Sequence, residues 1–341
     1  MGKNKIESVL FRTNAGKDIG FGHLFRCLSL AEVLKLCGIN SVFLANAEAE
    51  SKVAEYGFDF VCSESFNYND IERIRTINPD VVVFDSYLAD SSYIEGLAKE
   101  HFLVQFDDNN DIYGEISADI LINGNIHARG LNYISKKKRT RFLLGPEYLV
   151  MKSEYWNLES SDQSESSLLI TTGGADFFDL MPDFLEALGK LPLKKRVIVG
   201  PGFSESQIRK LEMLSENIEA CELIHRPSSL KEYIAQSSIV ISASGSTIYE
   251  ILTMKRLPVI FTLADNQRMI ARKLESFGIT NLGWYESIDF KKLPGIILPE
   301  IDIEDAKKTG LSELFSEFDG KGAMRTAKVI VDEVKKWKSQ K

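Results

Sequence analysis

Short apolar runs alternate with a helical pattern at the start of the chain. The runs at Ser8–Arg12, Ser41–Ala45 and Val81–Phe84 predict strands, and the β-branched third run is typical of a strand buried on both faces. Between the first two runs, apolar residues recur at helical spacing over Leu24–Leu36, and Gly38 follows as a stop signal. This alternation predicts a parallel α/β sheet.

The same alternation continues to the end of the chain and repeats in its second half. A helix is expected at Ser91–Lys99, followed by strands at His101–Phe106 and Ile120–Ile122. The strands expected in the second half are Leu168–Thr171, Arg196–Val199, Ile218–Leu223, Ile239–Ser242 and Pro258–Phe261. The last expected helix runs from about Ala323 to Lys338.

A polar stretch separates the two series. Residues 157–167 are mostly small and polar and carry no strand or helix pattern, which predicts a linker. We therefore expect an N-terminal α/β domain at 1–156 and a C-terminal one at 168–341, with the terminal helix able to pack back on the first domain. The predicted fold class is α/β, with two doubly wound, Rossmann-like domains and an interdomain cleft.

Composition narrows the class of protein. The 341 residues are 44% hydrophobic and 26% charged, as in ordinary globular proteins, and the net charge of −8 argues against binding to nucleic acid. No apolar run is long enough for a membrane span, and the polar N-terminus does not resemble a signal peptide. Four widely spread cysteines predict neither a zinc site nor a disulfide framework. We expect a cytoplasmic protein without metal or cofactor.

Ligands of parallel sheets bind beyond the carboxyl ends of the strands, so the loops at those ends are the candidate sites. These loops are Asn14–His23, Asp85–Tyr87, Asp107–Asp108, Asn123–Asn125, Gly173–Asp176 and Ser242–Glu250. In the first of them, Gly20 and Gly22 allow close approach of a ligand, and His23 begins the following helix. Phe25 occupies the place of the third glycine of a dinucleotide motif, which argues against a nicotinamide or flavin enzyme.

Two loops of the second half are rich in backbone amides. Gly173-Gly174 and Ser244-Gly245-Ser246-Thr247 each join a strand to a helix, and such helix starts can hold a diphosphate without a metal. Glu250, one turn into its helix, can accept two sugar hydroxyls. The alternative is an ordinary capped helix whose dipole Glu250 complements.

Several segments occur together in this chain in a recognisable order. They are Asp18-Ile19-Gly20-x-Gly22-His23-x-x-Arg26-Cys27-Leu28-x-Leu30-Ala31, Val83-Phe84-Asp85-Ser86-Tyr87, Phe106-Asp107-Asp108, Asp119-Ile120-Leu121-Ile122-Asn123, Leu144-Gly145-Pro146-Glu147-Tyr148, Gly173-Gly174-Ala175-Asp176, Ile241 to Glu250, and Asn266-Gln267. This set resembles the PseG family of nucleotide-sugar hydrolases from pseudaminic acid biosynthesis. More distantly, the chain is similar to the MurG-type glycosyltransferases of GT-B fold.

The resemblance implies a GT-B fold, a UDP-sugar substrate and a hydrolytic reaction in which His23 activates water. Asp85 or Asp107 would orient the imidazole or the water. The other residues that the resemblance and the loop positions place in the site are Arg12, Asn14, Gly20, Gly22, Tyr87, Asn123, Gly173, Gly174 and Ser244. For the nucleotide it implies Ile224 and His225 at the uracil, the amides of Gly245, Ser246 and Thr247 at the diphosphate, Glu250 at the ribose, and Asn266 and Gln267 beside the sugar.

The chain departs from the family at two places. The usual R-x-D reads Arg12-Thr13-Asn14, and the usual D-H-Y reads Asp85-Ser86-Tyr87, so the sugar can differ. Two alternative functions remain: a GT-B glycosyltransferase that uses the same donor, and a non-catalytic protein that binds a nucleotide sugar. The basic run at 136–141 could face an acceptor, although a solvated loop is the simpler interpretation.

Overall fold

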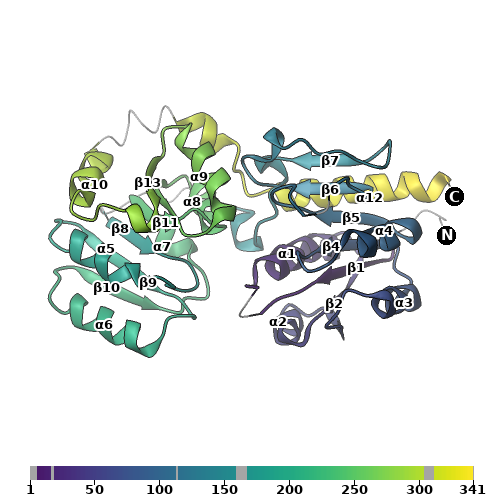
Figure 1. Cartoon of the computed structure of the whole chain (residues 1–341), viewed down its shortest axis with the longest axis horizontal. Helices are drawn as coiled ribbons and strands as arrows, with labels where there is room; N and C mark the ends of the chain where they lie inside the picture. Colours follow the sequence, from purple (N-terminus) through teal and green to yellow (C-terminus); the bar gives the residue numbers. More distant parts are fainter. Residues whose placement is uncertain (1–5, 17–18, 113, 159–166, 303–310, 341) are drawn as a thin grey trace. The chain divides into compact units, whose positions relative to one another are not determined.

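The computed structural model describes residues 6–16, 19–112, 114–158, 167–302 and 311–340. The chain divides into two compact units, the first formed by Met1–Trp156 with Gly320–Lys341 and the second by Asn157–Asp319 (Figure 1). The linker predicted at 157–167 falls largely on 159–166, outside the described residues, and its last residue, Ser167, already belongs to a strand.

Seven parallel strands form the sheet of the first unit, in the order β3-β2-β1-β4-β5-β6-β7. They are β1 (Ser8–Thr13), β2 (Asn40–Ala45), β3 (Asp59–Cys62), β4 (Val81–Asp85), β5 (Phe102–Phe106), β6 (Ile120–Asn123) and β7 (Arg141–Leu144). Every residue of β4 and β5 is buried, which explains their continuous apolar sequences.

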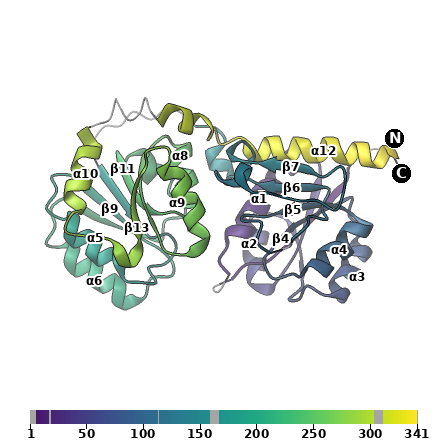
Figure 2. The same cartoon turned by 45° about the horizontal axis from the view of Figure 1, so that its top comes forward.

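Helices cover both faces of this sheet. They are α1 (Gly22–Leu36), α2 (Glu50–Glu55), α3 (Tyr68–Ile77), α4 (Ser91–Glu100) and α12 (Gly322–Gln340), with 3₁₀ turns η1 (Ala47–Ala49), η2 (Ala128–Gly130), η3 (Pro146–Tyr148) and η4 (Ser153–Tyr155). Helix α12 lies along the first unit and packs against α1 (Figure 2). Its residues Ala323, Ala327, Ile330 and Val334, at helical spacing, are buried in the same core as α1.

The second unit has six strands in the order β10-β9-β8-β11-β12-β13, all of them parallel. The strands are β8 (Ser167–Thr171), β9 (Lys194–Val199), β10 (Cys221–His225), β11 (Ile239–Ala243), β12 (Leu257–Thr262) and β13 (Thr280–Trp284). The helices and turns are α5 (Leu180–Leu188), α6 (Glu205–Ser215), α7 (Lys231–Ala235), α8 (Thr247–Thr253), η5 (Asp265–Gln267), α9 (Arg268–Glu275), η6 (Tyr285–Ser287) and α10 (Leu293–Asp302).

Each sheet has one point at which the direction of chain progress reverses. In the first unit the chain moves outward from β1 to β3 and then returns to lay β4 against the other side of β1. In the second unit β8 and β11 are the corresponding neighbours. In doubly wound sheets ligands bind beyond the carboxyl ends of such a strand pair, because the loops there diverge.

One predicted strand has a different start, and several elements were not predicted. The strand expected from Ile218 begins at Cys221, because Ala220 has a φ of 54°, which is incompatible with a strand. The strands β3, β7 and β13 were missed. They lie at or near sheet edges and are only partly buried, so they lack the continuous apolar sequence of the central strands.

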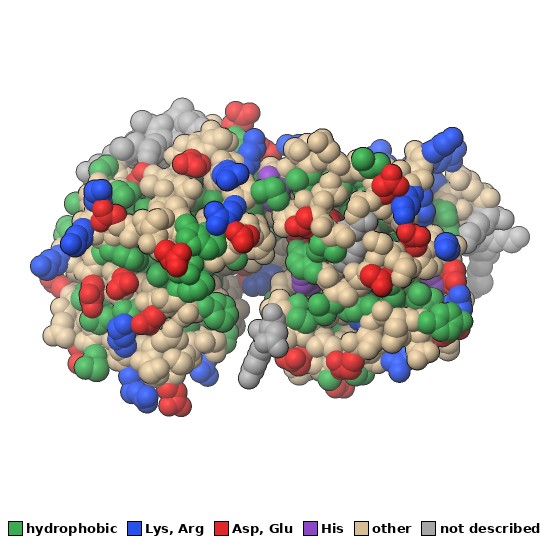
Figure 3. Space-filling view, in the orientation of Figure 1, with side chains coloured by type: hydrophobic (Ala, Val, Ile, Leu, Met, Phe, Trp, Pro, Cys, Tyr) green, Lys and Arg blue, Asp and Glu red, His purple; other side chains and the backbone are tan. Residues whose placement is uncertain are grey.

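Acidic and basic side chains are interspersed on each unit, on the face shown in Figure 3. Among the described residues, no helix is both long and apolar enough to span a membrane.

Candidate active site

A short closed loop places His23 at the carboxyl edge of the first sheet. After β1 the backbones of Gly16 and Gly20 exchange two hydrogen bonds, of 3.2 and 2.7 Å. Gly20 has a φ of 80°, in the left-handed region that favours glycine. Helix α1 begins two residues later, so His23 lies in its first turn, at the strand pair where chain progress reverses.

The imidazole of His23 is bonded to Asp85, the last residue of β4. Its Nδ1 lies 2.7 Å from Oδ1 of Asp85, which is fully buried, while His23 itself is 8% exposed. The imidazole also packs against the Tyr87 ring in a T-shaped arrangement, with the two ring centroids 4.5 Å apart. The other ring nitrogen, Nε2, makes no hydrogen bond to any residue that the structure describes.

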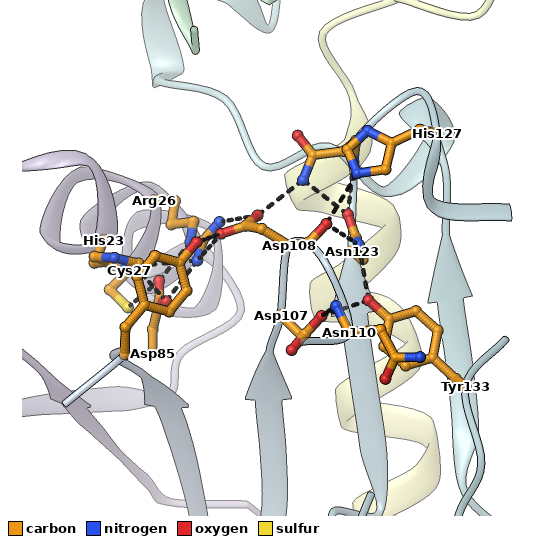
Figure 4. A network of polar contacts seen from close by, with 12 residues as sticks. His23, Arg26, Cys27, Asp85, Asp107, Asp108, Asn110, Asn123, His127 and Tyr133 are labelled. Atoms are coloured by element: carbon orange, nitrogen blue, oxygen red, sulfur yellow. Dashed lines mark hydrogen bonds and ion pairs between the residues drawn. The ribbon is translucent and has the colours of Figure 1, made fainter. Parts of the chain in front are cut away.

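Arg26 joins Asp85 to a second carboxylate. It lies one helical turn after His23, so both side chains share a face of α1. Its guanidinium donates to Asp85 at 2.5 and 2.6 Å and to Asp108 at 2.8 and 3.0 Å (Figure 4). The guanidinium also lies over the Phe106 ring, 4.8 Å from its centroid.

These contacts lower the pKa values of both carboxylates. Burial by itself raises the pKa of Asp85, but the Arg26 guanidinium and the His23 ring outweigh it, and the net pKa is below the usual range. The pKa of Asp108 is also lowered, because the charge and hydrogen bonds of Arg26 overcome the effect of burial. Nδ1 of His23 has two neighbours, the Asp85 carboxylate at 2.7 Å and Nη2 of Arg26 at 3.1 Å. The shorter contact, to an ionised Asp85, favours the tautomer with its proton on Nδ1 and its lone pair on Nε2.

Asp107 lies in a different set of contacts. Its carboxylate accepts hydrogen bonds from the Tyr133 hydroxyl at 2.6 Å and from the backbone N–H of Asn110 at 2.7 Å, and burial raises its pKa. The structure therefore places Asp85, and not Asp107, against the imidazole. Asp108, which the sequence interpretation did not select, belongs to the cluster instead, because consecutive residues of an extended chain point in opposite directions.

Asn123 has its whole amide engaged within the protein. Its Nδ2 donates to the backbone oxygen of Asp108 at 2.9 Å and to Tyr133, and its Oδ1 accepts from Asn125. Asn125 in turn donates to the Asp108 carboxylate at 2.8 Å. His127 Nε2 lies 3.0 Å from the backbone oxygen of Asp108. Asn123 thus orders the loops behind the cluster, which differs from the expected contact with substrate.

Arg12 is a correction to the expected site. It is fully buried, its guanidinium bonds Asp70 at 2.7 Å, and its remaining hydrogen bonds go to backbone oxygens. Tyr93 and Ser63 also donate to Asp70, which completes a closed network on the other face of the sheet. Arg12 is therefore a structural residue that ties the ends of neighbouring strands together.

Asn14 directly follows β1 and is 2% exposed. Neither polar atom of its side chain has a hydrogen-bond partner among the described residues. A buried amide without partners costs about 1–3 kcal/mol, so Asn14 is suited to bonding a ligand or a water. Its backbone is well fixed, because the Asn46 amide bonds the Ala15 backbone at both its N–H and its oxygen, at 2.9 and 2.6 Å.

In the second unit, the Gly173-Gly174 loop follows β8. Gly173 has a φ of 94°, and a Cβ built on either glycine would meet nothing within 4 Å, so the surface in front of them is open. On the other side, a Cβ at Gly200 would lie 2.4 Å from the backbone oxygen of Gly174. The loop is therefore packed from behind and open in front, as a loop that receives a ligand must be.

The loop after β11 contains one buried residue, Ser244, followed by residues that are at least partly exposed. Ser244 is fully buried, and both its N–H and its hydroxyl donate to the Phe261 oxygen at 2.9 Å, so it ties β11 to β12 and differs from the expected ligand contact. Gly245, Ser246 and Thr247 lead into α8 with at least part of their surface exposed, and Glu250 lies one turn into that helix, partly exposed.

The remaining predicted residues also lie at the carboxyl edge of the second sheet. Ile224 is buried and His225 exposed at the end of β10, which is separated from β11 by two strands, β9 and β8. Asn266 is exposed in the turn after β12, and Gln267 accepts a hydrogen bond from the Leu263 amide at 2.9 Å. Within the described residues, no group of three or more histidines, cysteines and acids could hold a metal ion.

Comparison with known proteins gives distant relatives. No family model matches the chain. An uncharacterized protein of Methanocaldococcus jannaschii is 25% identical over 264 residues, which are 73% of this chain and 54% of the relative, so this chain spans about half of the relative's length. The UDP-2,4-diacetamido-2,4,6-trideoxy-beta-L-altropyranose hydrolase of Campylobacter jejuni is 24% identical over 279 residues, covering 79% of this chain and 97% of the relative.

Solved structures establish the fold class. The glycotransferase of kitacinnamycin superposes with a TM-score of 0.70 at 15% identity, over 96% of this chain and 98% of that one. MurG of Acinetobacter baumannii superposes with a TM-score of 0.64 at 13% identity, over 97% and 99%. The chain therefore shares the GT-B fold of these proteins, and its two parallel-sheet α/β domains confirm the predicted fold class of two doubly wound domains.

Proposed function

We propose that this chain hydrolyses a UDP-linked amino or deoxy sugar at its anomeric carbon and releases UDP and the free sugar, as in biosynthesis of pseudaminic acid-type sugars. The observation that carries the proposal is the His23–Asp85 pair, in which Nδ1 is bonded to an ionised carboxylate and Nε2 is left unbonded. The distant similarity to a UDP-sugar hydrolase supports the substrate class.

In this reaction His23 is the general base. As the water oxygen forms its bond to the anomeric carbon, a water proton moves to Nε2 of His23. The bond from the anomeric carbon to the diphosphate oxygen breaks, and its electron pair leaves with UDP. Asp85 stays ionised and holds the new imidazolium through Nδ1.

The second unit would hold the nucleotide. The amides of Gly245, Ser246 and Thr247 would bind the diphosphate, whose negative charge suits backbone N–H groups at a helix start. Glu250 would bind the ribose hydroxyls and the main chain at Ile224–His225 the uracil. On the sugar side we assign Asn14, Tyr87, Asn266 and Gln267. With the leaving diphosphate stabilised in this way, the reaction needs no strong general acid.

Glycosyl transfer from the same donor is the second candidate, because the glycotransferase of kitacinnamycin shares this fold. The basic run at 136–141 gives it little support. Lys136 is paired with Glu95 at 2.7 Å and Lys137 with Asp119 at 2.8 Å, so two of its charges are already balanced on the surface of the first unit.

The test is an assay of free nucleotide with a panel of UDP- and CMP-sugars, with and without an added sugar or lipid alcohol, and with and without EDTA. Hydrolysis requires UDP release from at least one UDP-sugar without an acceptor, unchanged by EDTA. UDP release that depends on the acceptor would establish transfer instead. Tight binding of a UDP-sugar without any turnover would indicate a binding protein.

A further inference from the structure

The imidazole of His23 is held from two sides by residues that share one partner. Asp85 bonds its Nδ1 (Figure 4). The Tyr87 ring packs against the imidazole in a T-shaped arrangement. Arg26 links Asp85 to the Asp108 carboxylate, and the hydroxyl of Tyr87 donates to that same carboxylate. Asp108 does not contact His23, yet both holders of the imidazole depend on it.

Asp108 is itself firmly placed. Besides Arg26 and Tyr87, its carboxylate accepts a hydrogen bond from Asn125 at 2.8 Å. Its backbone oxygen accepts one from Asn123 at 2.9 Å. With its side chain about 20% exposed and fully bonded, Asp108 serves as an anchor within the protein rather than as a group offered to a ligand.

The charges of Arg26, Asp85 and Asp108 together give Asp108 a second role. Arg26 alone would neutralise Asp85 and leave nothing to balance an imidazolium. With Asp108, one guanidinium stands against two carboxylates, so the cluster keeps one net negative charge. A base that becomes positive during the reaction is stabilised by such a charge in a partly buried site. Among the described residues, Nη2 of Arg26 lies 3.1 Å from Nδ1 of His23, the Tyr87 ring contacts the imidazole, and the buried Cys27 thiol is linked to it through Asp85.

We propose that Asp108 is a positioning residue for His23: through Arg26 and Tyr87 it fixes the imidazole and supplies the negative charge that the imidazolium needs. This rests on the proposed function of His23 as the general base. It also makes a statement about the resting protein that requires no substrate.

The test compares Asp108→Asn with Asp80→Asn. Both changes remove the charge of an ion-paired aspartate, but Asp80 precedes β4, at the opposite end of the strand from Asp85, where it bonds Lys338 and the Glu7 amide. For both variants we would measure UDP release against pH, the thermal midpoint, and the NMR signals of the imidazole nitrogens and of the Nδ1 proton. Four histidines make assignment practical, with His23→Gln identifying the signal.

For Asp108→Asn we expect kcat to fall about 10- to 100-fold with little change in KM, because the base is misplaced while the binding loops are intact. The acidic limb of its pH profile should move to lower pH by about half a unit or more. Its Nδ1 proton signal should broaden or shift. Asp80→Asn should lower the thermal midpoint and change neither profile nor signal.

A kcat and pH profile in Asp108→Asn equal to those of Asp80→Asn would overturn the proposal. If the natural protein released no UDP from any donor, the proposed function would fail. The NMR comparison would still test the positioning role, because an unchanged His23 signal in Asp108→Asn refutes it. Should Asp108→Asn not fold, Tyr87→Phe removes only the hydroxyl bonded to Asp108 and must also shift that signal.

Discussion

Nδ1 of His23 lies 2.7 Å from Oδ1 of Asp85, although 62 positions separate the two residues in the chain. The pairing follows from the sheet. Strands β1 and β4 are neighbours with Thr13 opposite Asp85, and α1 starts soon after β1, so the first turn of α1 reaches the end of β4. The place where the chain reverses its progress across the sheet thus brings the imidazole together with the carboxylate that it bonds.

Replacement of His23 by alanine should abolish UDP release and leave UDP binding intact. General-base catalysis contributes about 10²- to 10⁴-fold, and the nucleotide contacts proposed above belong to the second unit. Two measurements on the same preparation check this: turnover of a UDP-sugar that the natural protein hydrolyses, and calorimetric titration with UDP. A variant with the natural turnover would remove His23 from the mechanism.

Asp85→Asn should lower kcat about 10²-fold or more. The new amide can present N–H to Nδ1, which favours the wrong tautomer and puts the proton on Nε2, and Arg26 loses one of its two carboxylates. Asp107→Asn is the matched control, because the Asp107 carboxylate bonds Tyr133 and Asn110. Kinetics and melting curves of both variants give the comparison. Equal losses of kcat in the two variants would contradict the assignment of Asp85.

Acid should destabilise the first unit through its carboxylate cluster. The pKa values of Asp85 and Asp108 are lower in the folded chain than in the unfolded chain, so the unfolded chain takes up protons first as the pH falls. The stabilisation is complete above the unfolded pKa of about 4 and is lost below it, by up to about 1.4 kcal/mol per pH unit for each carboxylate. Asp107 has a raised pKa, so its contribution is lost in the opposite direction, as the pH rises.

Urea unfolding of the natural protein and of Asp108→Asn between pH 2.5 and 7, a range chosen about the carboxyl pKa, measures this. The variant should be less stable at pH 7, and its stability should depend less steeply on pH below about 4. Parallel curves for the two proteins would show that Asp108 is not the group that titrates.

The sequence contains enough to place the central strands but not to choose among neighbouring side chains. Continuous apolar runs such as Val81–Phe84 identify buried strands directly, and the loops after them follow from the rule for parallel sheets. The edge strand β3, with the sequence Asp-Phe-Val-Cys, lacks that pattern, and its first and last residues are exposed while the two between them are only partly buried.

Within the site, the limit was the direction of individual side chains. Asp107 and Asp108 are adjacent in the sequence, and only the backbone path decides which of them meets Arg26. Arg12 was assigned to the site by its motif, yet a strand residue at that position faces the opposite layer, where Asp70 neutralises it. Arg26 had a usable signal: it lies one turn after His23 on the same helix.

Glu250→Ala should weaken UDP binding about tenfold, the equivalent of ~1.4 kcal/mol. The substitution removes the carboxylate that we propose accepts hydrogen bonds from two ribose hydroxyls, so both bonds are lost. Glu250 lies one turn into α8, next to the loop that we assign to the diphosphate. Glu216→Ala, at the exposed end of α6, makes the same change away from that loop. Calorimetry with UDP and with deoxy-UDP separates the ribose contact from a general loss of affinity. If Glu250 bonds the ribose, the variant should no longer distinguish the two nucleotides, while Glu216→Ala should distinguish them as the natural protein does. Equal affinity of Glu250→Ala and the natural protein for UDP would move the ribose site elsewhere in the second unit.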